Sequence, residues 1–278
     1  MYPAMMTWDM PTLLIMFLLG LVASTFGAVV GLGGGVIIVP ALLLLGPSML
    51  GMDIDTTLAV GVSLGSLAFT SLASALTFVK EGKVDLRSAL FFSLSSGPMS
   101  LVGASMTALF DPDDFRKAFG YFMLFMVVLL LFRSRIKPYQ GQWRYVRTYA
   151  DAAAGLQREY GFSALPALLI GGAVGLISGL LGIGGGVLLI PAMLLLFRFP
   201  PHIASATSMA VIFVSALFGS GMHLIRGEWD WLLVLALAPG SLLGGWLGAR
   251  VSRRIGSTAL IRIMCAALLL FAGRMIIT

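Results

Sequence analysis

Long apolar runs constrain the fold of this chain more than any other feature. A helix needs about 20 apolar residues to cross a hydrocarbon core of about 30 Å, and eight stretches approach or reach that length. They cover residues 11–30, 56–79, 86–109, 115–132, 164–181, 203–225, 231–251 and 259–277. Their apolar residues form continuous runs rather than the one-sided stripes of a soluble element. The sequence therefore predicts an all-α, polytopic membrane protein.

Composition and charge argue against several other classes of protein. Only 11% of the residues are charged, whereas soluble proteins carry about 25%, so we expect a lipid bilayer around most of the surface. The net charge of +6 comes from basic residues in loops beside the apolar runs, which favours membrane topology over nucleic-acid binding. Cys265 is the only cysteine, so one chain cannot form a disulfide or a thiolate metal site. We expect no cofactor and no metal.

The chain contains two copies of one plan. Residues 31–45 read GLGGGVIIVPALLLL and residues 182–196 read GIGGGVLLIPAMLLL, which are identical at ten of fifteen positions. A second spacing, of 145 residues, pairs Ala59 with Ala204, Ser63 with Ser208, Gly82 with Gly227, Asp85 with Asp230, Ser96 with Ser241 and Gly103 with Gly248. We therefore divide the chain into a first membrane repeat (1–132), a basic linker (133–163) and a second membrane repeat (164–278).

Basic residues mark cytoplasmic loops, and they change sides between the two copies. The loop at 80–87 has three basic residues, and its counterpart at 226–230 has one. The loop at 110–114 is acidic, whereas its counterpart at 250–262 has four arginines. With the basic linker in the cytoplasm, this pattern predicts two inverted-topology repeats of about four helices each. Inversion requires that the first segment of each repeat is glycine-broken or re-entrant and returns to its own side.

Each copy has a glycine triplet that breaks its first apolar segment. The triplets are Gly33, Gly34 and Gly35, and Gly184, Gly185 and Gly186; Pro40 and Pro191 follow five residues later. Broken helices are tolerated at membrane depth only where protein or a water-filled cavity satisfies the backbone. A helix that restarts after the break presents free N–H groups and about half a positive charge. The sequence thus predicts that the two triplets face each other, or a shared cavity, near the membrane midplane, with an anion site at the helix starts.

Close packing of helices through small residues is the alternative interpretation of these glycines. Two series of glycines spaced by four residues fit it, namely Gly27, Gly31 and Gly35, and Gly240, Gly244 and Gly248. Packing alone does not explain why the triplet and the proline recur together once in each copy.

The two G-x-G-G-G-x4-P motifs and the stretch ASATSM at 204–209 resemble the TauE/SafE sulfite exporter family. The likeness covers nearly the whole chain, and the motif pair is its specific part. It implies transport of sulfite, a sulfonate, sulfoacetate or thiosulfate across the bacterial inner membrane. By motif match it also implies that the triplets, Pro40, Pro191, Thr207 and Ser208 line the site. The first copy supplies Ser63 but has Val62 in place of Thr207, so we expect an asymmetric site.

Other polar residues allow further interpretations. We expect alternating access of one repeat against the other around a central site, and His223 could couple transport to protons, although a hydrogen bond at an interface is the commoner role. A passive anion channel would share the broken helices. Residues 61–65 read GVSLG, as in a serine nucleophile elbow, so Ser63 with His202 or His223 could form an intramembrane protease. That elbow needs a strand before the turn, and no lysine follows GLGGGV as in a phosphate-binding loop, so we expect no enzyme.

Overall fold

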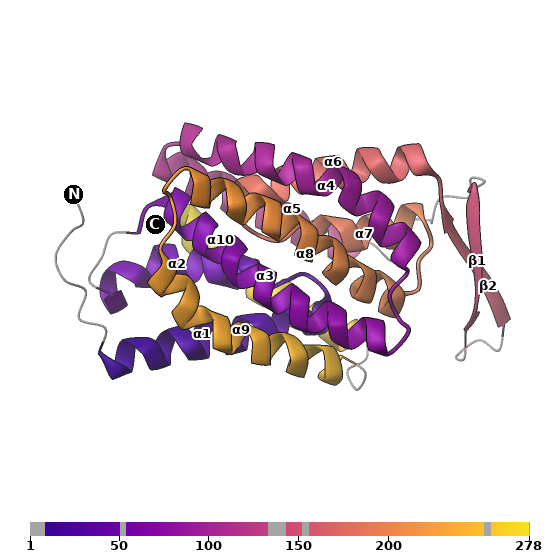
Figure 1. Ribbon diagram of the computed structural model, residues 1–278, viewed down its shortest axis with the longest axis horizontal. Helices are drawn as coiled ribbons and strands as arrows, with labels where there is room; N and C mark the ends of the chain where they lie inside the picture. The colour runs from indigo at the N-terminus through magenta and orange to yellow at the C-terminus, as the bar shows by residue number, and fades with distance from the viewer. Residues whose placement is uncertain (1–8, 51–53, 133–142, 152–155, 253–256, 278) are drawn as a thin grey trace.

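The computed structural model describes residues 9–50, 54–132, 143–151, 156–252 and 257–277. Within these residues it contains ten α-helices, a short 3-10 helix and one β-hairpin (Figure 1). The elements are α1 Met10–Val30, α2 Gly35–Leu50, α3 Thr56–Lys80, α4 Leu86–Met106, η1 Thr107–Leu109, α5 Pro112–Phe132, β1 Tyr145–Asp151, β2 Leu156–Phe162, α6 Ala164–Leu181, α7 Gly186–Leu196, α8 Pro201–Ile225, α9 Trp231–Val251 and α10 Ser257–Ile277. The all-α class predicted from the apolar runs is confirmed.

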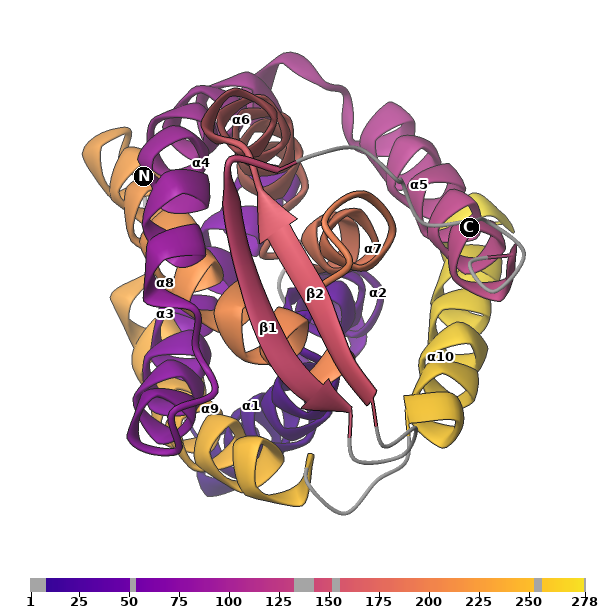
Figure 2. The same ribbon diagram turned by 90° about the vertical axis from the view of Figure 1, so that its right-hand side faces the viewer.

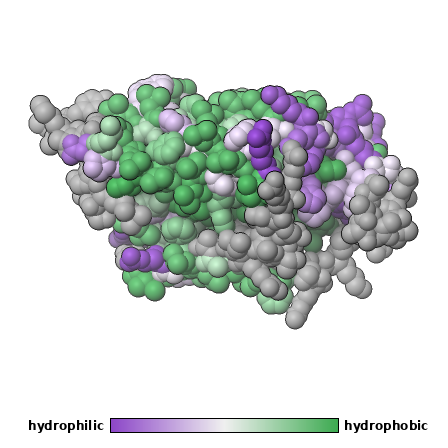
Figure 3. All heavy atoms as spheres, turned by 90° about the horizontal axis from the view of Figure 1, so that it is seen from below, coloured by the Kyte–Doolittle hydropathy of each residue, from purple (hydrophilic) through white to green (hydrophobic). Residues whose placement is uncertain are grey.

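Six of the described helices are long and apolar enough to cross a membrane: α1, α3, α4 with η1, α6, α8 and α9. The remaining two predicted spans are helical as well, in α5 and α10. Many large apolar side chains point away from the core, including Leu90, Leu94, Leu165 and Leu169, which are each more than 60% exposed. The surface in Figure 3 is apolar across the middle and more hydrophilic toward the hairpin end. Such a belt is what contact with lipid requires.

Two closely packed helix pairs join the repeats, and each pair takes one helix from each repeat. A side chain at Gly240, Gly244 or Gly248 of α9 would meet the α1 backbone at Phe17, Leu21 or Thr25, respectively. On the other side, side chains at Gly171, Gly175 and Gly179 of α6 would meet the α4 backbone near Phe92, Ser96 and Ser100. In both pairs the residue numbers of the contacts increase in the same direction along the two helices, so the helices run parallel. The glycines spaced by four in α9 therefore serve packing, as predicted.

Helices α3 and α8 pack against each other near the centre and run in opposite directions. Gly61 near the start of α3 lies against His223 near the end of α8, and Leu64 lies against Gly219. These two helices correspond under the spacing of 145 residues. Antiparallel packing of corresponding helices is what an inverted repeat requires, and the orientation of the loops across a membrane stays a prediction. Helices α5 and α10 form a further pair at the side of the molecule (Figure 2).

The repeat extends to the capping of helices. Asp85 and Asp230, which the spacing of 145 residues pairs, are the N-cap residues of α4 and α9, and each carboxylate accepts hydrogen bonds from backbone N–H groups of the following turn. Such caps satisfy donors that a helix start leaves without partners.

The linker contains structure that we did not predict. Strands β1 and β2 pair antiparallel, with Tyr145 opposite Phe162 and Arg147 opposite Tyr160. The hairpin lies across one end of the helices (Figures 1 and 2), where the rings of Tyr160 and Phe199 pack at 4.6 Å between centroids. The aromatic and β-branched residues in YVRTYA, which favour strands, were the only signal available. The basic residues at 133–137 lie outside the described residues.

Candidate functional site

The glycine motif breaks the chain in the same way in both copies. Helix α1 ends at Gly31, whose φ of 85° is left-handed, and α6 ends at Gly182, whose φ is 68°. After each end the chain turns through the triplet and a short helix begins, α2 at Gly35 and α7 at Gly186. Left-handed backbone favours glycine because a Cβ would clash with the following carbonyl. The predicted interruptions are therefore real helix ends with new helix starts.

Each short helix returns toward the end of the molecule from which its long partner came. Helix α1 runs parallel to α9, whereas α2 leads back to the start of α3 through a short connection. In the second repeat, the end of α7 approaches the hairpin, where the Trp143 indole N–H donates to the Leu196 carbonyl at 3.3 Å. The paths of α1–α2 and α6–α7 thus match the re-entrant first segments that the distribution of basic loops predicts for inverted repeats.

The two motifs lie directly against each other. A Cβ added at Gly35 would overlap the carbonyl oxygen of Gly182, and one added at Gly186 would overlap that of Gly31. Both carbonyls belong to the opposite repeat. Only glycine permits this approach of backbone to backbone. The expectation that the two motifs face each other is therefore fulfilled in the structure.

Two buried serines bind the motifs reciprocally. The Ser63 hydroxyl of α3 donates to the Gly182 carbonyl at 2.8 Å, and the Ser208 hydroxyl of α8 donates to the Gly31 carbonyl at 2.7 Å. Each serine is fully buried, and each satisfies an oxygen that the helix end leaves without a helical partner. In this arrangement the hydroxyls hold protein groups, and contact with a substrate stays a prediction.

Apolar side chains fill the space beside the triplets. A Cβ at Gly33 or at Gly184 would meet the side chains of Leu67 and Ile212. Leu67 and Ile212 correspond under the spacing of 145 residues, and both are essentially buried. This pair was not predicted from the sequence, although its spacing of 145 residues was an available signal. Leu67 and Ile212 therefore occupy the space directly beside Gly33 and Gly184.

Both short helices also contain backbone groups without helical partners. The first turn of a helix leaves N–H groups without helical partners, and such groups favour a negative charge. In α7 the first of them, the Gly186 N–H, already donates to the Gly184 carbonyl at 2.8 Å. Pro40 and Pro191 are buried inside α2 and α7, and a proline in a helix deprives the carbonyl four residues earlier of its donor. Each motif thus has N–H groups at its start and, one residue further along, the carbonyl of Val36 or Val187 without its helical donor.

Thr207 has a role that the sequence did not indicate. Its hydroxyl oxygen accepts a hydrogen bond from the backbone N–H of Asp85 at 3.0 Å, and both residues are buried. Thr207 therefore joins α8 to the start of α4, while the neighbouring Ser208 joins α8 to the first glycine motif. Val62, its counterpart in the first copy, cannot make such a bond, and the asymmetry of a substrate site stays a prediction.

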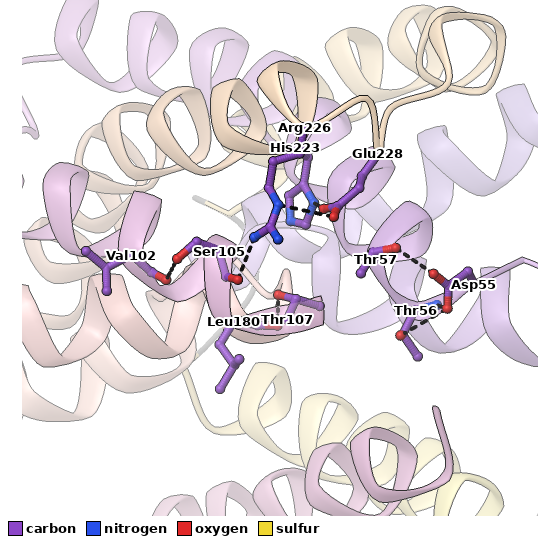
Figure 4. A network of polar contacts seen from close by, with 10 residues as sticks. All are labelled: Asp55, Thr56, Thr57, Val102, Ser105, Thr107, Leu180, His223, Arg226 and Glu228. Carbon is purple, nitrogen blue, oxygen red and sulfur yellow. Dashed lines mark hydrogen bonds and ion pairs between the residues drawn. The ribbon is translucent and has the colours of Figure 1, made fainter. Parts of the chain in front are cut away.

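His223, in the last turn of α8, lies in an ion network with Glu228 and Arg226 (Figure 4). Its Nδ1 lies 3.0 Å from a carboxylate oxygen of Glu228, and Arg226 contacts the other oxygen at 3.3 Å. Arg226 also donates to the Ser105 carbonyl at 2.7 Å. His223 is fully buried, and its Nε2 has no hydrogen-bond partner among the described residues. The network is separate from the glycine motifs.

The context for a serine nucleophile is absent at Ser63. The residue lies within helix α3 rather than at a turn after a strand, and its hydroxyl donates to a backbone carbonyl. A nucleophilic serine instead needs its hydroxyl within reach of a base.

Comparison with known proteins places this architecture in a family. The model for the family described as "Sulfite exporter TauE/SafE" matches residues 16–275. The chain is 40% identical over 264 residues to "Probable membrane transporter protein YunE" of Bacillus subtilis, covering 94% of this chain and 96% of the relative. It is 27% identical to YdhB of the same organism, covering 86% and 88%, and 27% identical to a probable membrane transporter of Haemophilus influenzae, covering 88% and 87%. No solved structure gives a significant match.

Proposed function

Because this chain belongs to the TauE/SafE sulfite exporter family and is a membrane transporter, we propose that its cargo is a small sulfur-containing anion. Sulfite, a sulfonate, sulfoacetate and thiosulfate form the candidate class. The name of the family supports the class, and the chemistry of two opposed helix starts supports the charge. We further propose that the protein lies in the bacterial inner membrane with linker 133–163 in the cytoplasm.

The observation that carries the proposal is the direct contact of the two glycine motifs. Gly35 and Gly186 start helices against the carbonyls of Gly182 and Gly31. Two helix starts from opposite directions then share one small region, and each contributes partial positive charge without a lysine or arginine. Neutral donors of this kind suit an anion that must bind and leave again.

Alternating access gives the apolar pair beside the triplets a role. Leu67 and Ile212 occupy the space beside the triplets, so an anion reaches the helix starts only when one of these side chains moves. The two are corresponding residues of antiparallel helices. Their alternate withdrawal would open the site first to one side and then to the other, as in transporters built from inverted repeats.

Flux through the purified protein tests the proposal. In proteoliposomes, uptake of sulfite, thiosulfate, sulfoacetate and taurine is measured with and without a proton gradient. We expect saturable flux of at least one of these anions, and Gly34→Leu should abolish it without loss of membrane insertion. Gly221→Leu is the matched control, since a Cβ at Gly221 would meet nothing within 4 Å. No flux of any of these anions, or wild-type flux in Gly34→Leu, would overturn the proposal.

The same assay separates a carrier from a channel. Saturation and a response to the proton gradient favour a carrier, whereas large unsaturated conductance favours the channel alternative. The proposed proton coupling through His223 has its own test, because His223→Gln should remove the response to the gradient and leave binding of the anion intact. An unchanged response would remove His223 from the coupling.

Orientation is tested by cysteine labelling in a Cys265→Ser background. Single cysteines at Lys83 and Gly227 should be labelled from opposite sides of the membrane if the repeats are inverted. Labelling from one side would show parallel repeats.

A further inference from the structure

The linker hairpin and the start of α4 enclose a pocket of about 260 Å³. A single ordered water needs roughly 10 to 15 Å³ of such space, so a small solute with water fits. The lining residues are Asp85, Arg87, Arg144, Tyr145, Val146, Arg147, Tyr160, Gly161 and Phe162. The pocket is at the hairpin end, away from both glycine triplets, and none of the arginines contributes to the site proposed above.

The pocket is lined by three guanidinium groups and one carboxylate. Among the described residues, no carboxylate pairs with Arg87 or Arg144. Arg147 lies 3.4 Å from Asp85, and its side chain remains 47% exposed. A concave surface with an excess of one charge concentrates ions of the opposite sign. The pocket is therefore a positively charged enclosure.

The single carboxylate is directed into the protein. The Asp85 side chain is only 1% exposed. One oxygen accepts from the backbone N–H of Ser88 at 3.2 Å and contacts Arg147, and the other accepts from the Tyr160 hydroxyl at 3.3 Å. Because protein donors hold both oxygens, Asp85 fixes the wall of the pocket and leaves its open side to Arg87 and Arg144.

The second repeat has no counterpart of the arginines that line this pocket. The second copy has Leu232 at the position that corresponds to Arg87, and the linker that supplies Arg144 and Arg147 occurs once. A basic residue that only fixes membrane topology needs no enclosure, whereas here three arginines from two segments distant in sequence converge. Arginine presents donors in a planar fork that matches the oxygens of sulfate, sulfonate and phosphate groups.

We propose that this pocket binds a small free oxyanion of the sulfate or phosphate type, with Arg87 and Arg144 as its principal ligands. The pocket would form a second anion site, at the linker end of the protein. It is also connected to α8, because the backbone N–H of Asp85 donates to Thr207. The proposal does not depend on which anion the central site carries.

Hydrogen exchange of the full-length protein with sulfate tests this site directly. The protein is placed in nanodiscs of phosphatidylcholine, and exchange over residues 145–162 is compared in sodium sulfate and in sodium chloride at equal ionic strength. We expect sulfate to slow exchange in the hairpin. In Arg87→Gln/Arg144→Gln the protection should disappear, and each single variant should need about tenfold more sulfate, as loss of one charged hydrogen bond implies.

Lys117→Gln is the matched control, since it removes one exposed positive charge at the start of α5. It should leave the sulfate dependence within about twofold of wild type. The variant Arg87→Lys/Arg144→Lys keeps the charge but loses the planar fork, and should bind sulfate more weakly than wild type and more tightly than the double glutamine variant. If the double glutamine variant fails to fold, the sulfate dependence of the two single variants tests the proposal, and a dependence equal to that of wild type in both would overturn it.

A phosphate group on a lipid could offer the same chemistry, so a second set of nanodiscs contains phosphatidylglycerol. Hairpin protection by this lipid without sulfate, and none by sulfate in phosphatidylcholine, would assign the pocket to a lipid headgroup and overturn the proposal. Equal exchange in sulfate and chloride would overturn it as well, as would unchanged sulfate protection in the double glutamine variant.

Discussion

A methyl group placed between the two glycine motifs should destabilise the protein more than its size suggests. The perturbations are Gly35→Ala and Gly186→Ala, which introduce a Cβ well inside 3.0 Å of the carbonyl oxygens of Gly182 and Gly31. Ordinary contact begins at about 3.4 Å, so the opposing backbones must separate. Each carbonyl is also held by a buried serine hydroxyl, and neither oxygen can simply rotate away.

The magnitude follows from overpacking. Adding a methyl to a packed interior costs about 1 to 3 kcal/mol, and here the obstacle is backbone rather than a flexible side chain, which puts each variant toward the upper end of that range. Glycine to alanine in an open helix position instead gains up to about 1 kcal/mol. Gly221→Ala is therefore the control, because nothing lies within 4 Å of its added Cβ.

The assay is unfolding of the detergent-purified protein, followed by transport in proteoliposomes. We expect both Gly35→Ala and Gly186→Ala to lower the free energy of unfolding by about 2 to 3 kcal/mol and to reduce flux, with Gly221→Ala neutral or slightly stabilised. Variants at the motif that unfold like Gly221→Ala would refute the direct contact of the two motifs, and with it the argument for a shared anion site.

Three further results are expected. Ser208→Ala leaves a buried carbonyl without its donor and should cost about 1 to 3 kcal/mol of stability, whereas Ser215→Ala, which loses only a bond within its own helix, should cost less; equal losses would contradict the bridging role. Thr207→Val should loosen the start of α4, seen as faster hydrogen exchange at Asp85, and unchanged exchange there would show that the bond is dispensable. Burial, aided by the Asp85 carboxylate, raises the pKa of Tyr160 above 10.0. The stability that the neutral Tyr160 side chain contributes is therefore fully present below pH 10 and is lost as the pH rises through the raised pKa. A difference spectrum against Tyr160→Phe should show ionisation above pH 10, and ionisation at or below pH 10 would refute the burial.

The sequence by itself determined the features that depend on local composition and on repetition. Runs of about 20 apolar residues have one stable form in lipid, so the long helices, all except α2 and α7, could be placed from sequence. Glycine triplets break a helix wherever they occur, and the ends of α1 and α6 fall there for that reason. The duplicated spacing of 145 residues also anticipated that Asp85 and Asp230 play equivalent parts.

Only the tertiary structure decided which groups meet. Ser63 and Ser208 hold carbonyls of the opposite repeat, 119 and 177 residues away, and no local pattern encodes a partner at that distance. Leu67 and Ile212 read as ordinary apolar residues until the helices cross beside the triplets. The hairpin was missed because its strands are short and polar, and a two-stranded ribbon is stable only against the surface on which it packs. Long-range packing, rather than propensity, sets these contacts.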